Sequence, residues 1–177
     1  MKKFFVLFLV AMATLTVAKA QVYVGGTVGF SSSKADSDAS SETSFKIMPE
    51  VGYNLSDKWA IGTTLGYADG SINLAGLNFG DAKAFTIAPY VRYTFFKSNL
   101  VNLFVDGGVG YSNLKVNDVK SDVLEIAIKP GLAVNLSENV SLVAKYGFLG
   151  YRKHEEASNF GLNLDGNALS FGFYYSF

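Results

Sequence analysis

The chain contains no cysteine and only 3 prolines among its 177 residues. The absence of cysteine excludes disulfide bonds and any metal site built on thiolates. Long hydrophobic runs are also missing after residue 20, because polar or charged residues interrupt each apolar stretch well short of the about 20 residues that a membrane helix requires. Aromatic residues are instead abundant, with 15 Phe and 10 Tyr. This composition favours β-structure.

Residues 1–20 have the pattern of a secretory signal peptide. A positive start at Lys2 and Lys3 is followed by the apolar run 4–17 and then by Ala18-Lys19-Ala20, a small-residue cleavage pattern. We expect cleavage after Ala20, which leaves 21–177 as a single domain. Without its first 20 residues the chain has 12 basic against 15 acidic residues, a net charge of −3. That balance argues against a nucleic-acid partner, which would favour a basic face.

From residue 21 onward, apolar residues recur at every second position. Segment 85–95 is typical, with Phe, Ile, Pro, Val, Tyr and Phe alternating with Thr, Ala, Tyr, Arg and Thr. A period of two predicts β-strands with one apolar face. We expect eight strands, at 22–31, 44–55, 59–68, 83–96, 100–112, 123–136, 140–151 and 166–177.

The connections between these segments alternate strictly in length. Three are short, at 56–58, 97–99 and 137–139, and four are long and polar, at 32–43, 69–82, 113–122 and 152–165. This alternation predicts an antiparallel up-and-down barrel with all short turns at one end, together with both termini. Pro49, Pro89 and Pro130 each precede a short turn by several residues. Proline donates no hydrogen bond to a central ladder, so we expect a bulge at each of them.

The polar face of the strands indicates which side faces inward. It consists mainly of Gly, Ala, Ser and Thr, whereas the exposed surface of a soluble barrel would carry many more charges. Small residues with few ionisable groups suit the interior of a narrow barrel. The sequence therefore predicts an all-β, eight-stranded transmembrane barrel with its apolar face outward. Seven charged residues are expected in its lumen: Lys46, Glu50, Arg92, Asp106, Glu125, Lys129 and Lys145.

These lumen charges allow two interpretations. Arg92 and Asp106 are expected on paired strands as diagonal neighbours. Four basic and three acidic groups can nearly neutralise one another and plug the lumen, because an unpaired buried charge is costly. The alternative is a gated path for ions. Aromatic girdles are expected at both ends of the apolar band: Tyr53, Trp59, Tyr93, Phe95, Tyr175 and Phe177 near the short turns, and Tyr67, Tyr111 and Phe148 near the long loops.

The signal pattern, the three proline-containing hairpins and the final segment 171–177 together resemble the outer membrane protein β-barrel (porin-like) family, whose small members are OmpA/OmpX-type barrels of Gram-negative bacteria. The resemblance covers all of 21–177. It implies an integral protein of the outer membrane, surrounded by its lipid, with both termini periplasmic. The alternating Phe173, Tyr175 and Phe177 resemble the family's assembly signal, which implies transient contact with the outer-membrane insertion machinery.

Function is less constrained, because such barrels serve several roles. We expect a monomeric, non-enzymatic envelope protein that acts through its structure or its long outer loops. A narrow porin-like channel for small solutes is the alternative, and a lipid-modifying enzyme is more distant. For the enzyme, His154, Glu155, Glu156 and Ser158 are the candidates, but a triad requires convergence in space and no nucleophile motif is present. No segment shows calcium-loop or zinc spacing, so neither a metal nor another cofactor is expected.

Overall fold

A computed structural model of the chain describes residues 21–33, 42–74, 77–116, 119–154, 157–163 and 169–177. The predicted signal peptide lies outside these residues. The described strands are β1 (Val22–Ser33), β2 (Glu42–Asn54), β3 (Trp59–Leu74), β4 (Leu77–Lys97), β5 (Val101–Val116), β6 (Val119–Asn135), β7 (Val140–Lys145), β8 (Phe148–His154), β9 (Ala157–Asn163) and β10 (Ser170–Ser176).

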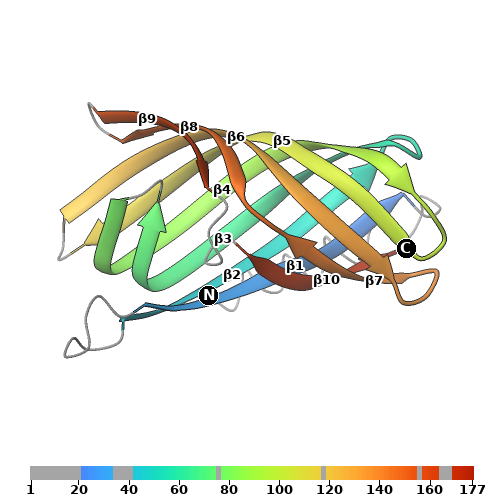
Figure 1. The fold of residues 1–177 in the computed structure, drawn as a ribbon, viewed down its shortest axis with the longest axis horizontal. Coiled ribbons are helices and arrows are strands. Elements are labelled where there is room, and N and C mark those ends of the chain that lie inside the picture. The colour runs from blue at the N-terminus through green and yellow to red at the C-terminus, as the bar shows by residue number, and fades with distance from the viewer. Residues whose placement is uncertain (1–20, 34–41, 75–76, 117–118, 155–156, 164–168) are drawn as a thin grey trace, which may run out of the picture.

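Eight of these strands form a closed antiparallel ring. The order is β1-β2-β3-β4-β5-β6-β7-β10, and β10 returns to pair with β1 (Figure 1). The predicted eight-stranded up-and-down barrel is therefore confirmed. No helix among the described residues is long and apolar enough to cross a membrane.

The predicted strand 140–151 is divided into β7 and β8, which both pair with β6. Between the pairs Gly131↔Lys145 and Ile128↔Leu149, β6 advances by three residues and the opposite chain by four. The extra residue is a bulge opposite Pro130, whose carbonyl accepts a hydrogen bond from Tyr146 N at 3.1 Å. Gly147 has a φ of 79°, a left-handed conformation that favours glycine. The bulge expected at Pro130 is present.

The prediction of a bulge at Pro49 and at Pro89 is wrong. The β2–β3 register is the same on both sides of Pro49, and the β4–β5 register is the same on both sides of Pro89. The ladder is interrupted there without an extra residue, because proline has no N–H to donate. In β4 the register shifts instead between Thr94 and Phe96. This shift places Arg92 directly opposite Asp106, not diagonal to it.

The three short turns share one local design. Ser56, Ser98 and Ser137 each accept a hydrogen bond through Oγ from the backbone N–H three residues later, at 3.1, 2.9 and 3.1 Å. Serine is favoured in turns because its hydroxyl can replace a backbone partner in this way. One such serine lies in each of the three short turns, and these turns all lie at the same end of the barrel, called here the short-turn end.

At the opposite end of the barrel, strands extend beyond their predicted bounds as long hairpins. This end is called here the hairpin end, and it differs from the prediction. Segments 69–82 and 113–122 are mainly strand, because β3 pairs with β4 up to Leu74↔Leu77 and β5 with β6 up to Val116↔Val119. Part of the predicted loop 152–165 forms the β8–β9 hairpin. The ladders continue after the outward residues change from apolar to polar. The prediction of loops at these positions rests on the end of the apolar outward face, and strand pairing does not require that face to continue.

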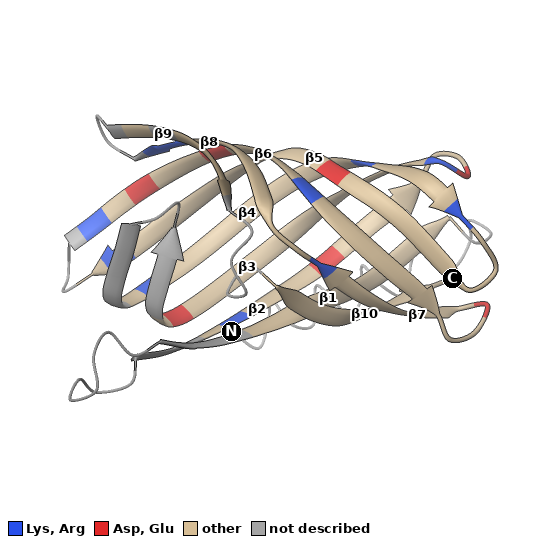
Figure 2. Ribbon diagram, viewed as in Figure 1, with Lys and Arg blue, Asp and Glu red and all other residues tan. Residues whose placement is uncertain are grey.

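Side-chain burial confirms the predicted orientation of the two faces. Along β10 the residues alternate between buried and exposed, with Phe171 53% and Phe173 60% exposed. Similar apolar residues, such as Phe85 and Ile126, are exposed around the outer wall. Charged residues are few along the strands (Figure 2). The outer surface is thus an apolar band, and the polar groups of the middle of the barrel lie inside.

Candidate functional site

Four aromatic side chains fill part of the lumen, and each is at most 8% exposed. Each stands directly opposite a glycine of a neighbouring strand. A Cβ atom on that glycine would lie within 2.2 to 2.5 Å of the facing side chain. The glycines therefore provide the space that the rings occupy, an arrangement known to stabilise glycine in sheets. The pairs are Tyr23–Gly52, Tyr90–Gly62, Phe104–Gly131 and Tyr174–Gly25.

Replacing Gly62 with alanine should destabilise the folded barrel by about 1–3 kcal/mol, the usual cost of overpacking. The new methyl group would lie 2.4 Å from the Tyr90 hydroxyl oxygen and 2.8 Å from the Val51 carbonyl oxygen. Gly110→Ala is the matched control, because its nearest neighbours would be 3.6 Å away. Denaturant unfolding in lipid vesicles measures both variants. Equal stabilities would contradict the packing role of Gly62.

Four charged side chains form a central cluster: Glu50 (β2), Arg92 (β4), Asp106 (β5) and Lys145 (β7). Arg92 binds Asp106 through two bonds, Nε to Oδ1 at 2.6 Å and Nη2 to Oδ2 at 2.8 Å. Arg92 Nη2 also lies 3.0 Å from Glu50 Oε1. Lys145 Nζ lies 2.7 Å from Glu50 Oε2 and 2.9 Å from Asp106 Oδ2. Two carboxylates and two cations make this cluster neutral.

Tyrosine hydroxyl groups complete the central cluster. Tyr90 and Tyr174 both donate to Glu50 Oε1, the latter at 2.8 Å. Arg92 Nη2 donates to the Tyr174 hydroxyl at 3.0 Å. Strands β4 and β10 are four strands apart in either direction around the ring. The hydrogen-bonded side chains of Arg92 and Tyr174 therefore reach across the lumen from opposite walls.

The central cluster is tightly enclosed. The guanidinium carbon of Arg92 lies 3.9 Å from the centre of the Phe104 ring, a cation–π distance. Arg92 is 7% exposed, Asp106 4% and Glu50 5%. Within the described part of the chain, no buried side-chain nitrogen or oxygen lacks a hydrogen-bond partner. The charged and hydroxyl groups at the centre of the lumen therefore form a fully hydrogen-bonded network among the described residues.

A second group lies closer to the hairpin end and is called here the hairpin-side cluster: Lys46 (β2), Glu125 and Lys129 (β6), and Arg152 (β8). Lys129 Nζ lies 2.5 Å from Glu125 Oε1, and Arg152 Nε lies 2.6 Å from Glu125 Oε2. The structure thus divides the seven predicted lumen charges between two clusters and adds Arg152.

Arg152 was missed, and the girdle position predicted for Phe148 is wrong, for one physical reason. The bulge at 146–147 reverses which face each following residue occupies, as any shift by one residue does in a strand. Phe148 is therefore 5% exposed inside the barrel, with the Arg152 guanidinium carbon 3.8 Å from its ring centre. The glycine two residues after Lys145 was the available signal for this bulge.

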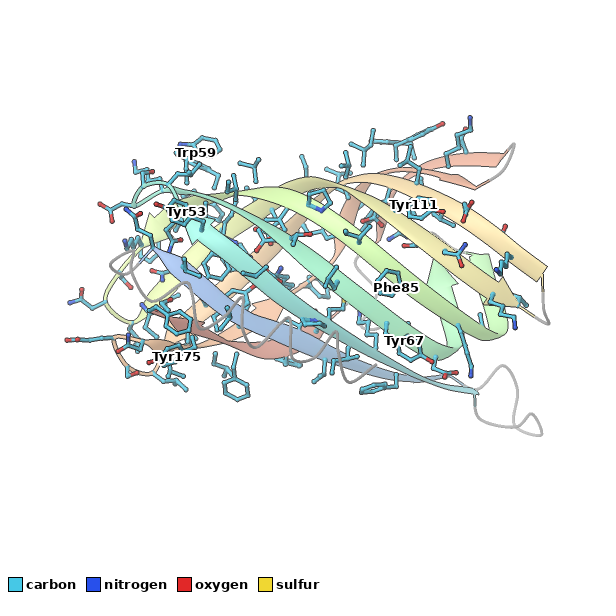
Figure 3. All side chains as sticks on the ribbon, turned by 180° about the vertical axis from the view of Figure 1, so that it is seen from behind. Tyr53, Trp59, Tyr67, Phe85, Tyr111 and Tyr175 are labelled. Carbon is cyan, nitrogen blue, oxygen red and sulfur yellow. The ribbon has the colours of Figure 1, made fainter. Side chains whose placement is uncertain are left out.

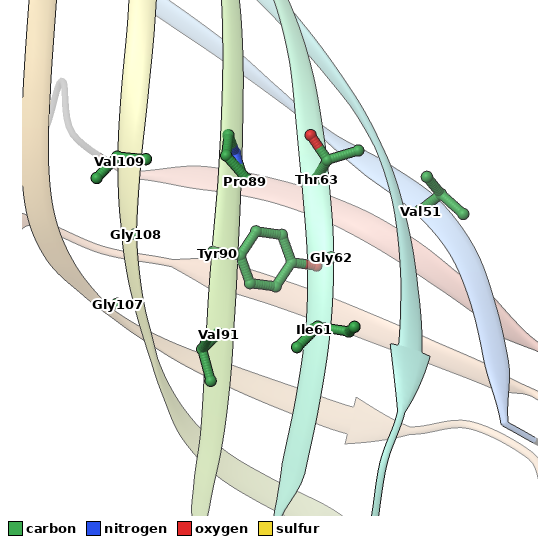
Figure 4. Close-up of a pocket in the computed structure, with 10 residues that line it drawn as sticks. All are labelled: Val51, Ile61, Gly62, Thr63, Pro89, Tyr90, Val91, Gly107, Gly108 and Val109. Carbon is green, nitrogen blue, oxygen red and sulfur yellow. The ribbon is translucent and has the colours of Figure 1, made fainter.

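The outer wall also has a shallow apolar depression over strands β2 to β5 (Figure 4). Gly107 leaves it open, because a Cβ there would meet nothing within 4 Å. Val51, Ile61, Pro89, Val91 and Val109 line it. An apolar depression on the outer wall is suited to contact with lipid chains. We therefore take the polar lumen, and not this depression, as the candidate functional site.

The candidate hydrolase residues are only partly visible, since Glu155 and Glu156 lie outside the described residues. In the β8–β9 ladder Ser158 stands opposite Lys153, whereas His154 stands opposite Ala157. The register therefore does not pair the serine with the histidine. Among the residues that the structure places, no group of three or more His, Cys, Asp or Glu side chains could hold a metal ion.

Comparison with known proteins identifies the family. The family model described as "outer membrane protein beta-barrel domain" matches residues 4–177. The chain belongs to this family. It is accordingly an integral β-barrel protein of the outer membrane, as the resemblance implied. No curated protein sequence matches the chain.

Solved structures share the fold of this outer-membrane barrel at low sequence identity. The N-terminal β-barrel domain of Pseudomonas aeruginosa OprF is 14% identical, with a TM-score of 0.56 over 89% of this chain and 98% of that one. Neisserial surface protein A is 18% identical, with a TM-score of 0.53 over 88% and 95%. E. coli outer membrane protein W is 11% identical, with a TM-score of 0.50 over 89% and 98%. These similarities concern the fold alone.

Aromatic side chains of the outer-membrane barrel mark both ends of its apolar band (Figure 3). Tyr53, Trp59 and Tyr175 lie toward the short-turn end, and Tyr67 and Tyr111 toward the other. Trp59 packs on Tyr93 with ring centres 4.7 Å apart. Apart from Phe148, this distribution fits the two girdles typical of membrane barrels.

Two of the residues proposed as an assembly signal, Phe173 and Tyr175, lie on β10 where it closes the ring, and Phe177 directly follows this strand. Phe173 and Tyr175 are exposed on the outer wall, and the Tyr175 ring packs edge-on against Phe177 at 5.0 Å. The backbone N–H of Phe177 donates to Val22 O at 3.0 Å. These three side chains thus form an apolar patch beside the junction of the first and last strands.

Proposed function

We propose that this protein is a non-enzymatic outer-membrane barrel with a closed lumen, acting through its structure and through the surface of its hairpins. The observation that carries the proposal is the bond between Arg92 and Tyr174, which joins opposite walls of the barrel at 3.0 Å. A channel would require this bond and the ion pairs around it to open. Their neutrality and complete hydrogen bonding favour the closed state.

The extended hairpins support a role at the membrane surface. Their outward residues are polar, for example Asn113 and Asp122, whose side chains are hydrogen-bonded to each other at 2.8 Å. Ordered hairpins with polar outward side chains are suited to contacts with other molecules in the water outside the membrane. We propose that this end faces outward and that both termini are periplasmic, with Phe173, Tyr175 and Phe177 engaging the insertion machinery during assembly of a monomer.

Conductance across planar bilayers tests the closed lumen. The purified protein should show no stable stepwise conductance, whereas Arg92→Ala should introduce a leak by removing the group that spans the lumen. Lys97→Ala is the control, since Lys97 pairs with Asp57 between two short turns. Stable conductance of the unmodified protein would reject the proposal in favour of the narrow channel.

A further inference from the structure

The two lumen clusters differ in charge balance. The central cluster combines two carboxylates with two cations, whereas the hairpin-side cluster combines the single carboxylate of Glu125 with Lys46, Lys129 and Arg152. Glu125 already uses both oxygens, one for Lys129 and one for Arg152. These four described side chains therefore carry a net charge of +2 when all of them are ionised.

Lys46 raises the net positive charge of this cluster from +1 to +2. Its side chain crosses Gly29 of the neighbouring strand, since a Cβ at Gly29 would lie 2.2 Å from Lys46 Cε. Lys129 and Arg152 act on it electrostatically, and both carry the same sign. Strands β2 and β6 are four strands apart in either direction around the ring, so Lys46 and Lys129 come from opposite walls. Cations on opposite walls repel each other more strongly in a narrow lumen than in water.

Lys129 does not relieve this repulsion through the central cluster. It stands opposite Asp106 in the β5–β6 ladder, but Asp106 is occupied by Arg92 and Lys145. Gly110 stands opposite Glu125 in the β5–β6 ladder, and a Cβ there would make only ordinary contacts at 3.6 Å. Lysine and arginine groups converging inside a barrel are the arrangement that selects anions and phosphate in pores.

We propose that the hairpin-side cluster is a binding site for a phosphate-type oxyanion, held between Lys46 on one wall and Lys129 and Arg152 on the other. The bound anion neutralises the excess positive charge. Arginine is suited to phosphate because its planar group offers several donors, and the bond to Glu125 uses only Nε. The site lies on the hairpin side of the central cluster, so it does not depend on whether the lumen conducts.

Calorimetric titration of the purified protein with inorganic phosphate, in a maltoside detergent at constant ionic strength, tests this site. Lys46→Met should weaken phosphate binding by about tenfold, because one of three cations is lost. Glu125→Gln should tighten it by about threefold or more, because a competing carboxylate becomes neutral. Lys97→Met removes an equal charge at the short-turn end of β4 and should leave phosphate binding unchanged.

A second titration with a short-chain phosphatidic acid separates a dissolved anion from a lipid headgroup. Binding of that lipid alone, with the same dependence on Lys46 and Glu125, supports the site and assigns the phosphate to a lipid. Failure of both ligands to bind, or binding that neither substitution alters, overturns the proposal. If Lys46→Met does not assemble, the direction of the Glu125→Gln effect decides, since a merely structural role of the cluster predicts no tighter binding.

Discussion

Replacing Arg92 with methionine is expected to destabilise the barrel by about 3–5 kcal/mol if the central cluster is dry, the usual cost of removing one partner of a buried ion pair. Methionine keeps much of the length of the side chain but leaves Glu50 and Asp106 with Lys145 as their remaining cation. Urea unfolding in lipid vesicles, followed by the fluorescence of Trp59, the only tryptophan, measures the loss. Water entering the lumen would reduce it.

A double-mutant cycle separates the ion pair from general effects on packing. Asp106→Asn in the Arg92→Met background should restore part of the lost stability, because one uncompensated carboxylate disappears. Recovery should be incomplete, since Arg92 also binds Glu50 at 3.0 Å. Lys97→Met, at an exposed pair with Asp57, should leave the unfolding midpoint unchanged. Coupling within error of zero between Arg92 and Asp106 would contradict a dry, paired central cluster around the Arg92–Tyr174 bond.

The strand count, the orientation of the faces and the short turns could be predicted because each depends on a local pattern. Alternation identifies a face, and serine-containing turns fix where each hairpin begins. The inward positions of Glu50, Arg92 and Asp106 follow from that alternation. Their convergence from β2, β4 and β5 does not, because it also depends on register.

Register was the part that the sequence could not supply. The bulge between Thr94 and Phe96 brings Arg92 opposite Asp106, and the bulge at 146–147 turns Phe148 and Arg152 inward. Each inserts one residue, and one residue changes the face of every residue beyond it. The pairing of buried aromatic rings with glycines also depends on the register between neighbouring strands. Alternation places Tyr90 inside, but only the β3–β4 register places it opposite Gly62.

Replacing Phe177 with serine should lower the amount of barrel assembled in the membrane several-fold, whereas Phe160→Ser should have little effect. Serine keeps the backbone N–H that donates to Val22 O, so the variant tests the ring, which packs on Tyr175. Phe160 lies on β9, is 73% exposed and has no part in closing the ring.

Membrane fractions from cells expressing each variant at equal level provide the measurement for this prediction. Unfolding of the fraction that does assemble provides the necessary second readout. If Phe177 acts during assembly, the assembled Phe177→Ser barrel should unfold at nearly the same urea concentration as the unmodified protein, because the ladder between β1 and β10 is unchanged. A parallel fall in yield and stability would instead assign Phe177 to the folded wall. Equal yields for the Phe177 and Phe160 variants would exclude an assembly role for the last residue.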